Sequence, residues 1–374
     1  MKMPIATILD RAARGATLSE AEALALFALD DAAALRDLYA VADQRRAALA
    51  GDEVTYVRNR NLNFTNVCIT NCTFCGFKRN KQDADSYTLD TEQMLRKIEE
   101  ALSEEITEVC IQGGLNPELK LDYYCALVRE VKAHYPDIHV HAFSPQEIQF
   151  LIDNNEVSLT YVLSSLKEAG VDSLPGTAAE ILRDAMRLRI SPRRLMTAQW
   201  VEIITTAHRV GLPTTSTMMY GHLESAEDIV EHYRVLRHIQ LDTGGITEFV
   251  PMAFVPFTTH LGRKHEIRSV SSQTLTFKVY AIARLYFQEL MVNLQTSWVK
   301  LGLECAVESV RVGVNDLGGT LLEENITRLA GGQHGQRLDL DKARALLAPT
   351  GRPLVQRDTL YRRVPANQSA MSVG

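Results

Sequence analysis

The chain has 374 residues, 46% hydrophobic and 23% charged, enough for one large core with smaller additions. Its formal net charge of −6 provides neither a basic surface for nucleic acid nor a cationic helix for a membrane. No apolar run approaches the length of a bilayer span. Asp10, Arg11 and Arg14 interrupt the amino-terminal stretch, which therefore lacks the apolar centre of a signal peptide. We expect a cytoplasmic protein that binds neither nucleic acid nor membrane.

Short apolar runs alternate with amphipathic helical patterns along most of the chain. The runs predicted as strands are 62–68, 107–114, 139–145, 171–176, 213–221, 247–254, 293–298 and 314–320. Parallel strands joined by crossover helices in this number close into an α/β barrel of the (β/α)8 TIM type. We expect residues 1–61 to form a helical segment and a hairpin leading into the barrel, and residues 62–320 to form the barrel. Residues 321–374 are expected to form a helical tail that packs on it.

Three cysteines, Cys68, Cys72 and Cys75, stand close together in the run NVCITNCTFCGF. Closely spaced thiolates in an intracellular chain favour a soft metal, and three are one short of a closed site. A four-iron cluster held in this way keeps one iron open to a small chelating molecule. Structural zinc takes four protein ligands, commonly as two pairs, and no second pair is present. The spacing therefore favours an open iron–sulfur cluster over a zinc site or a redox disulfide.

The first predicted strand leads directly into this cysteine loop, so the loop is expected at the carboxyl end of the barrel, where such folds carry their active sites. Residues that follow the other strands should face the same cavity. These candidates are Gly113, Gly114, His141, Ser144, Glu180, Tyr220, His222, Glu224, Trp298 and Asp316, of which Trp298 is more typical of a core. The remaining cysteines, Cys110, Cys125 and Cys305, are expected to be small core residues.

The spacing C-x3-C-x2-C, with Phe74 before the last cysteine, resembles the signature of the radical S-adenosylmethionine (SAM) enzymes. Their second common mark, Gly-Gly after the second strand, is present as Gly113 and Gly114. Further segments resemble the 4-hydroxybenzyl-transferring, CofH-type subunits of deazaflavin (FO) synthase. They are CIQGGLNPEL, HVHAFSP, DSLPGTAAEIL, TTSTMMYGH, TEFVPMAFVPF, SWVKLG, NDLGGT and PLVQRDTLY. The resemblance runs from about residue 55 to 362, with one small departure at Gly76, where Ala is common.

This resemblance implies a radical SAM barrel and a transferase of deazaflavin biosynthesis. Cys68, Cys72 and Cys75 would hold three irons of a 4Fe-4S cluster, and S-adenosyl-L-methionine would chelate the fourth. A 5′-deoxyadenosyl radical would abstract hydrogen from L-tyrosine, whose Cα–Cβ bond then breaks. The 4-hydroxybenzyl group would be added to 5-amino-6-(D-ribitylamino)uracil. The implied protein partners are a companion radical SAM subunit that closes the ring and a ferredoxin- or flavodoxin-type electron donor.

The resemblance also implies roles for individual residues. Those expected to bind SAM or cover the cluster are Phe74, Phe77, Gly113, Gly114, Ser144 and Glu180. Those expected to act on or bind the substrates are Tyr220, His222, Glu224, His141 and Asp316. Each has an ordinary structural alternative: a turn at the glycines, an apolar cover at the phenylalanines, a helix-dipole partner at Glu180 and a satisfied structural group at the histidines.

Two other functions stay open from the residues alone. A sister radical SAM enzyme of the futalosine route to menaquinone would share the cluster and the barrel, although LPGTAAE and PLVQRDTLY favour the deazaflavin branch. A non-catalytic iron–sulfur or zinc protein would be of a different class, and such a carrier normally has four cysteine ligands in a small fold. Binding of SAM would distinguish an enzyme from a carrier.

Overall fold

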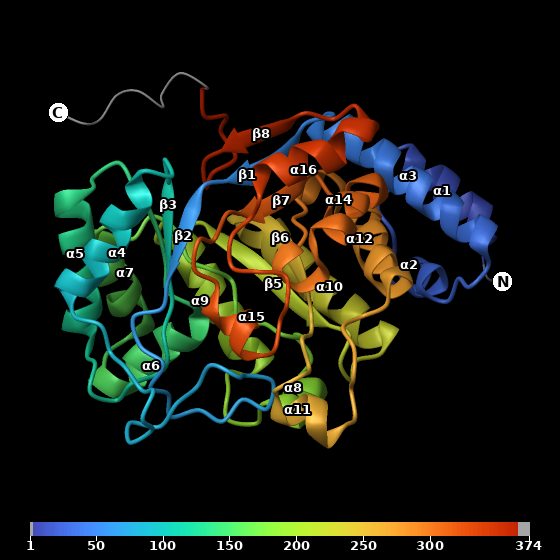
Figure 1. The fold of residues 1–374 in the computed structure, drawn as a ribbon. Helices are drawn as coiled ribbons and strands as arrows, with labels where there is room; N and C mark the ends of the chain where they lie inside the picture. The colour runs from blue at the N-terminus through green and yellow to red at the C-terminus, as the bar shows by residue number, and fades with distance from the viewer. Residues whose placement is uncertain (1–2, 366–374) are drawn as a thin grey trace.

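Parallel strands surround one axis in the computed structural model, which describes residues 3–365 (Figure 1). The strands are β1 (Val54–Val57), β2 (Asn59–Leu62), β3 (Glu108–Ile111), β4 (His139–Ala142), β5 (Thr214–Tyr220), β6 (Ile246–Ala253), β7 (Asp316–Gly319) and β8 (Leu354–Arg357). The pairs β2–β3–β4, β5–β6 and β7–β1–β8 are all parallel. Single bridges at residues 173–174 join β4 to β5, and bridges at 294–295 join β6 to β7, which completes the ring.

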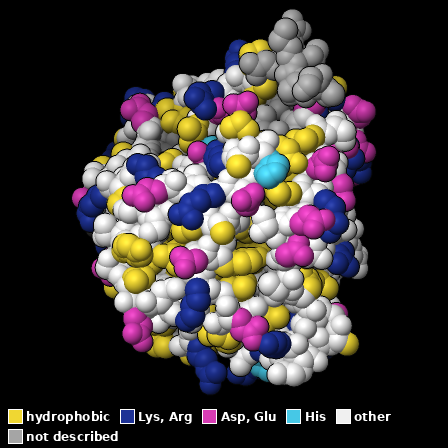
Figure 2. Space-filling view, turned by 90° about the vertical axis from the view of Figure 1, so that its left-hand side faces the viewer, with side chains coloured by type: hydrophobic (Ala, Val, Ile, Leu, Met, Phe, Trp, Pro, Cys, Tyr) yellow, Lys and Arg dark blue, Asp and Glu magenta, His cyan; other side chains and the backbone are white. Residues whose placement is uncertain are grey.

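Helices lie around the outside of this ring and at one of its ends (Figure 1). They are α1 (Ile5–Ala13), α2 (Glu20–Phe27), α3 (Ala32–Ala50), α4 (Thr91–Leu102), α5 (Leu121–His134), α6 (Pro145–Asn155), α7 (Leu159–Ala169), α8 (Asp184–Ile190), α9 (Thr197–Arg209), α10 (Ala226–Thr243), α11 (His260–Lys264), α12 (Gln273–Phe287), α13 (Trp298–Leu301), α14 (Leu303–Ser309), α15 (Asn325–Leu329) and α16 (Leu340–Leu347), with short 3-10 turns η1 (Gln288–Leu290), η2 (Val310–Val312) and η3 (Ala348–Thr350). Within residues 3–365, none of them is long and apolar enough to cross a membrane. Figure 2 shows acidic and basic side chains interspersed over one face of the molecule.

The first strand lies further upstream than predicted. β1 and β2 follow one another almost without a break at 54–62 and do not pair with each other, so the expected strand at 62–68 and the expected hairpin before it are both corrected. The strand was missed because three of its residues, Asn59–Arg60–Asn61, are polar, whereas strands are recognised by apolar residues. The predicted strands at 171–176 and 293–298 are reduced to bridges, and Pro175 lacks the N–H that a longer ladder needs.

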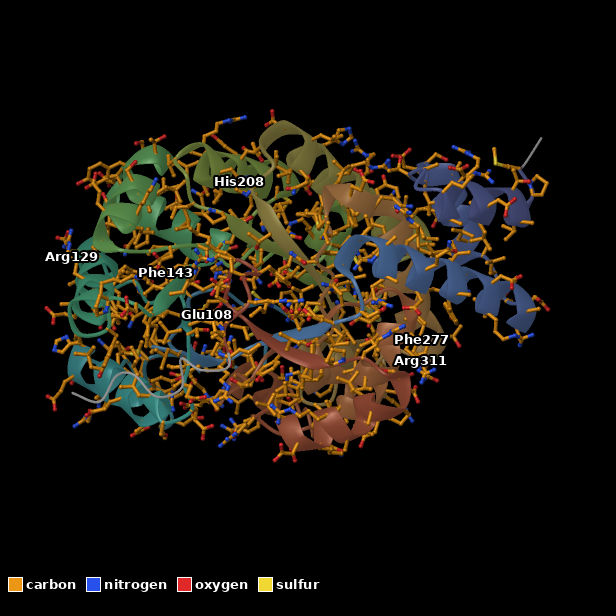
Figure 3. All side chains as sticks on the ribbon, turned by 90° about the horizontal axis from the view of Figure 1, so that it is seen from above. Glu108, Arg129, Phe143, His208, Phe277 and Arg311 are labelled. Atoms are coloured by element: carbon orange, nitrogen blue, oxygen red, sulfur yellow. The ribbon has the colours of Figure 1, made fainter. Side chains whose placement is uncertain are left out.

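The strands send apolar side chains outward to the helices and polar side chains inward. Outward residues such as Leu62, Ile111 and Val140 are at most 1% exposed and belong to the main core. Inward residues are polar, as Glu108 on β3 and His141 on β4 show. Because neighbouring residues of a strand point to opposite faces, this alternation separates the apolar core under the helices from the polar interior of the barrel. Figure 3 shows Glu108 between the strands and Arg129 at the outer edge of the helix layer.

The amino ends of the strands, which we call the base, are closed by the segment that contains β8. Arg357 donates to both oxygens of Asp316, at 2.6 and 3.0 Å, and to Glu248 at 3.1 Å. Its guanidinium lies 3.9 Å from the centre of the Tyr361 ring. Burial raises the pKa of Glu248 to about 7, against the opposing effect of Arg357. The tail was predicted to be helical, without a strand, yet β8 lies in it and in Figure 1 closes the end opposite α8 and α11.

The placement of Asp316 is therefore corrected. It begins β7 instead of following a strand, so it lies at the base and not at the rim. Besides Arg357, its carboxylate accepts from the backbone N–H of Gly318 at 2.6 Å and from the Thr55 hydroxyl at 2.5 Å. Trp298 is buried and donates to the Gly319 carbonyl at 3.0 Å, as a core residue would.

Loss of the Arg357 side chain is expected to be strongly destabilising. Arg357→Leu leaves two buried carboxylates without their cation, which costs about 3–5 kcal/mol of unfolding free energy in comparable buried pairs. The matched control is Arg209→Leu, because Arg209 and Asp242 form a 3.0 Å ion pair whose side chains are 63% and 57% exposed. That change is expected to cost less than about 1 kcal/mol. Equal losses in urea unfolding would contradict the role of Arg357.

Candidate active site

The cysteine loop lies at the rim, the end of the barrel opposite the base. Cys68, Cys72 and Cys75 form no disulfide bond, and all three are partly exposed. The backbone N–H of Cys68 donates to the Arg79 carbonyl at 3.1 Å, and that of Cys75 to the Cys72 carbonyl at 3.2 Å. The hydroxyl of Thr70 lies 3.0 Å from the Cys68 sulfur and 3.7 Å from the Cys72 sulfur. The backbone thus gathers the thiols in one loop.

This donor set fits a cluster better than a single ion. Among residues 3–365, no group of three or more His, Cys, Asp or Glu side chains converges on one metal position. Each cysteine of an iron–sulfur cluster binds a different iron, so the thiols need only surround a common space. Burial, together with Cys72 and Cys68, raises the pKa of Cys75. When the cluster is bound, its irons would supply the positive charge that holds these groups as thiolates.

A cation, Arg194, lies beside the cysteine loop and was not predicted from the sequence. Its Nη1 donates to Glu180 at 2.8 Å, and its guanidinium lies 5.6 Å from the centre of the Phe74 ring. Burial opposes its charge, but Glu180 and the three cysteines raise its pKa further above the ordinary value. One arginine in a loop has no spacing signal, so only the fold reveals that it joins the predicted Glu180 to the cysteine loop.

Glu180 itself is held in an unusual backbone conformation, with φ of 42°. Its side chain is about 9% exposed and also lies 3.5 Å from Arg187. Arg187 is buried and donates to the carbonyls of Ala178, at 2.9 Å, and Leu195, at 2.6 Å. The fixed loop that results holds Glu180 beside Arg194. A role for Glu180 in SAM binding stays a prediction.

Gly113 and Gly114 allow the chain that leads to the cysteines to cross the end of β3. A Cβ on Gly113 would lie 2.6 Å from the ring of Phe64, and one on Gly114 would lie 2.2 Å from the Val67 carbonyl. The Gly114 N–H donates to the Thr65 carbonyl at 2.8 Å. The glycine pair is therefore required for the position of the cysteine loop. Its predicted contact with SAM stays a prediction.

Ser144 and Glu147 form a buried capping box at the start of α6. The Ser144 N–H and hydroxyl donate to Glu147 at 2.8 and 2.6 Å, and the Gly113 N–H donates to the other carboxylate oxygen at 2.9 Å. Burial raises the pKa of Glu147 to about 7. Glu147 was not predicted as a site residue, although it ties the glycine pair to α6. The predicted cofactor contact of Ser144 stays a prediction.

Tyr220 lies in the core and not at the cavity. Its side chain is fully buried, and its hydroxyl is 3.2 Å from the Thr276 hydroxyl of α12, outside the barrel. The prediction of a stacking ring at this strand end is therefore wrong. Tyr220 ends β5 on the outward-facing side of the strand, where the helix layer covers it.

His222 and Glu224 close the turn after β5. The Nε2 of His222 lies 3.0 Å from the Met219 carbonyl, and its Nδ1 accepts from the Leu223 N–H at 2.7 Å. Glu224 accepts from the N–H groups of Gly221 and His222. Burial lowers the pKa of His222. The hydrogen bonds of both side chains stay within the turn and stabilise its conformation at the rim. A direct role in substrate binding stays a prediction.

The two predicted phenylalanines differ in position. Phe74 is partly exposed beside Arg194, whereas Phe77 is 6% exposed and packs edge-on against Tyr87, with centroids 6.5 Å apart. His141 lies inside the barrel, 2.7 Å from the Ser173 hydroxyl. The structure thus brings Phe74 and Glu180 to the cysteine loop, and places His141 below it.

Residues 62–236 match the Radical SAM superfamily, and residues 243–362 match the CofH/MqnC C-terminal region. A 5-amino-6-(D-ribitylamino)uracil–L-tyrosine 4-hydroxyphenyl transferase of Methanothermobacter thermautotrophicus is 48% identical over 88% of this chain and 90% of its own length. This chain belongs to that radical SAM transferase family. A second member, from Gloeobacter violaceus, is 45% identical over 96% of this chain and 94% of its own length. The predicted family is confirmed.

Three further proteins extend this result. The FO synthase of Nocardia farcinica is 46% identical over 93% of this chain, which corresponds to only 40% of that longer protein. Methylornithine synthase (PylB) superposes with a TM-score of 0.71 at 18% identity, covering 93% of this chain and 97% of its own. The hydrogenase maturase HydG superposes with a TM-score of 0.72 at 16% identity, covering 96% and 76%. At these identities the likeness establishes the fold, and it confirms the radical SAM barrel.

Gly114→Ala is expected to displace the cysteine loop. The new Cβ would overlap a backbone carbonyl, and such overpacking costs roughly 1–3 kcal/mol. We expect a lower unfolding midpoint and less iron bound after anaerobic reconstitution. The control is Gly244→Asn, because Gly244 has φ of 64° and no neighbour within 4 Å of a Cβ, and Asn tolerates that conformation. Unchanged stability and iron content in Gly114→Ala would contradict this role.

Glu147 is expected to make stability depend on pH. Its pKa rises from 4.5 to about 7 on folding, so the folded chain holds this proton more tightly than the unfolded chain. The unfolding free energy should therefore fall as pH rises between these values, by about 3 kcal/mol from this residue alone. In urea unfolding, the free energy of the wild-type chain should fall by that amount, relative to the free energy of Glu147→Gln, between pH 4.5 and 7.5. A difference that stays constant with pH would contradict the buried acid.

Proposed function

We propose that this chain breaks the Cα–Cβ bond of L-tyrosine and transfers the 4-hydroxybenzyl group to 5-amino-6-(D-ribitylamino)uracil, a step in deazaflavin synthesis. The observation that carries the proposal is the rim loop of Cys68, Cys72 and Cys75 in a chain 48% identical to a transferase of that name over most of both chains. The futalosine-route alternative shares the CofH/MqnC region, but the transferases named above favour the deazaflavin reaction.

The three rim cysteines would hold the cluster, and Arg194 would pair with the carboxylate of SAM. When bound, the cluster and SAM supply a 5′-deoxyadenosyl radical. Glu180 orients Arg194 through their 2.8 Å hydrogen bond, and Arg187 holds the loop that carries Glu180. Phe74 would offer an apolar surface beside the same guanidinium. Arg194 would thus connect the cluster loop to bound SAM, and its contacts with Glu180 and Phe74 support this role.

The barrel itself would protect the reaction. The Arg357 network closes the base, so substrates reach the interior from the rim, past the cysteine loop. A radical survives only where water and stray hydrogen donors are kept away, and a closed base serves that end. Radical chemistry of this kind fits the cytoplasm, where thiols stay reduced.

Two protein partners follow from the proposal. A ferredoxin- or flavodoxin-type donor would deliver the electron that starts each turnover. A companion radical SAM subunit would close the ring of the product, and the longer FO synthase, of which this chain matches 40%, supports a second catalytic part.

The test is an anaerobic turnover of the reconstituted chain with SAM, dithionite, tyrosine and the ribitylaminouracil, analysed by mass spectrometry. We expect deoxyadenosine and a uracil adduct heavier by one hydroxybenzyl group. Cys72→Ala should abolish both products, because a cluster with two cysteines lacks a ligand. Cys125→Ala, which changes a buried cysteine far outside the loop, should retain both. Deoxyadenosine formed only with futalosine-type substrates would contradict the proposal.

A further inference from the structure

The upper half of the barrel interior carries uncharged side chains that stay in contact with solvent. We call this region the upper lumen, and its inward-facing members are Asn61, Cys110, Gln112, His141 and Gln295. All of them except His141 are partly exposed, whereas the outward neighbour Ile111 is fully buried. A side chain inside a closed barrel that remains accessible borders unfilled space. The expectation that Cys110 is a core residue is thereby corrected.

His141 presents one ring nitrogen to this space. Its Nδ1 lies 2.7 Å from the Ser173 hydroxyl, which lies 2.6 Å from the Nε2 of His139. Because the hydroxyl has one proton, Ser173 donates to one imidazole and accepts from the other. Within residues 3–365, no hydrogen bond uses the Nε2 of His141. The Nε2 of His141 is therefore free to form a hydrogen bond with a ligand.

The carboxylates beneath the upper lumen all accept hydrogen bonds, and the cation among them, Arg357, is already engaged by two of them. Arg357 pairs with Asp316 and Glu248 at the base. The oxygens of Glu108 accept from Asn59 at 2.8 Å and from Thr359 at 2.7 Å.

His141 does not supply a positive charge to the upper lumen. Burial, with a smaller effect of Arg357, lowers the pKa of His141 to about 3. Its imidazole is therefore neutral at physiological pH, as are the amides of Asn61, Gln112 and Gln295.

We propose that the upper lumen binds the ring of 5-amino-6-(D-ribitylamino)uracil, with the Nε2 of His141 hydrogen-bonded to a polar group of that ring. The inference rests on the proposed function, which supplies this substrate. The uracil ring is neutral and has both donors and acceptors at its edge, as do the side chains of Asn61, Gln112 and Gln295. The carboxylate of free tyrosine would lose water there without gaining a cation, because Arg357 is already paired. Tyrosine therefore binds nearer to the rim.

The test compares two buried histidines that each contact hydroxyls. His141→Ala removes one hydrogen bond to the ligand, so equilibrium binding of the ribitylaminouracil to the intact chain should weaken about 10-fold in calorimetry. His141→Gln should recover part of this loss, because its amide reaches the position of Nε2. His208 is the matched control, since it lies outside the barrel, 2.5 Å from the Thr243 hydroxyl and 3.0 Å from that of Thr214 (Figure 3). His208→Gln should bind the uracil as the wild type does.

Turnover separates the two substrates. In the reconstituted enzyme, His141→Ala should raise the KM for the uracil about 10-fold and leave unchanged both the KM for tyrosine and the tyrosine-dependent deoxyadenosine. A raised KM for tyrosine with an unchanged KM for the uracil would overturn the proposal. Unchanged uracil binding in the calorimeter would also overturn it. If His141→Ala fails to fold, Asn61→Ala replaces it, because the Asn61 side chain makes no hydrogen bond within residues 3–365 and its loss leaves the fold intact.

The same data keep the two proposals apart. A wild-type chain that binds the uracil through His141 but forms no adduct would contradict the proposed function and support the site. A wild-type chain that forms the adduct, with full uracil binding in His141→Ala and Asn61→Ala, would overturn the site alone. A wild-type chain that does not bind the uracil at all would overturn the site.

Discussion

The ion pair between Arg357 and Asp316 is the contact on which the rest of the interior depends. A barrel lined with polar side chains must satisfy the buried ones, because an unpaired buried carboxylate is costly. This protein does so at one end, where Arg357 also reaches Glu248 at 3.1 Å. The base is thereby closed, and the space above it is lined by uncharged groups. The proposed radical chemistry at the rim and the proposed binding of the neutral uracil in the interior both fit this arrangement.

The rim is fixed by a second constraint, the close approach of two chain segments. The glycine pair lets residues 64–67 lie against the end of β3, and Glu147 binds the N–H of Gly113 at 2.9 Å. The position of the cysteine loop is thus set by its contacts with the barrel and with α6. On its other side, Arg194 connects it to Glu180. A loop that holds three ligands of a cluster needs such supports, because the metal alone does not set where the open iron points.

The sequence was most informative where chemistry demands a fixed spacing. The cysteine loop and the glycine pair were recognisable because neither tolerates insertion, and the alternation of strands and helices indicated the barrel. Arg194 and Glu147 escaped prediction, since a single charged residue in a loop or a helix is typical of a solvated surface. Tyr220 was misplaced because a strand end offers two faces, and only the fold decides which one is inward. The role of Arg357 was hidden for another reason: its partners lie 41 and 109 residues away in sequence.

A crystal structure of the anaerobically reconstituted chain with SAM and the ribitylaminouracil would test the account most directly. The account predicts the cluster on Cys68, Cys72 and Cys75, the SAM carboxylate at Arg194, and the uracil ring inside the barrel within hydrogen-bond distance of His141. The Arg357 network should be unchanged beneath it. A uracil bound outside the barrel, or a cluster held away from the rim cysteines, would contradict the division of the interior described above.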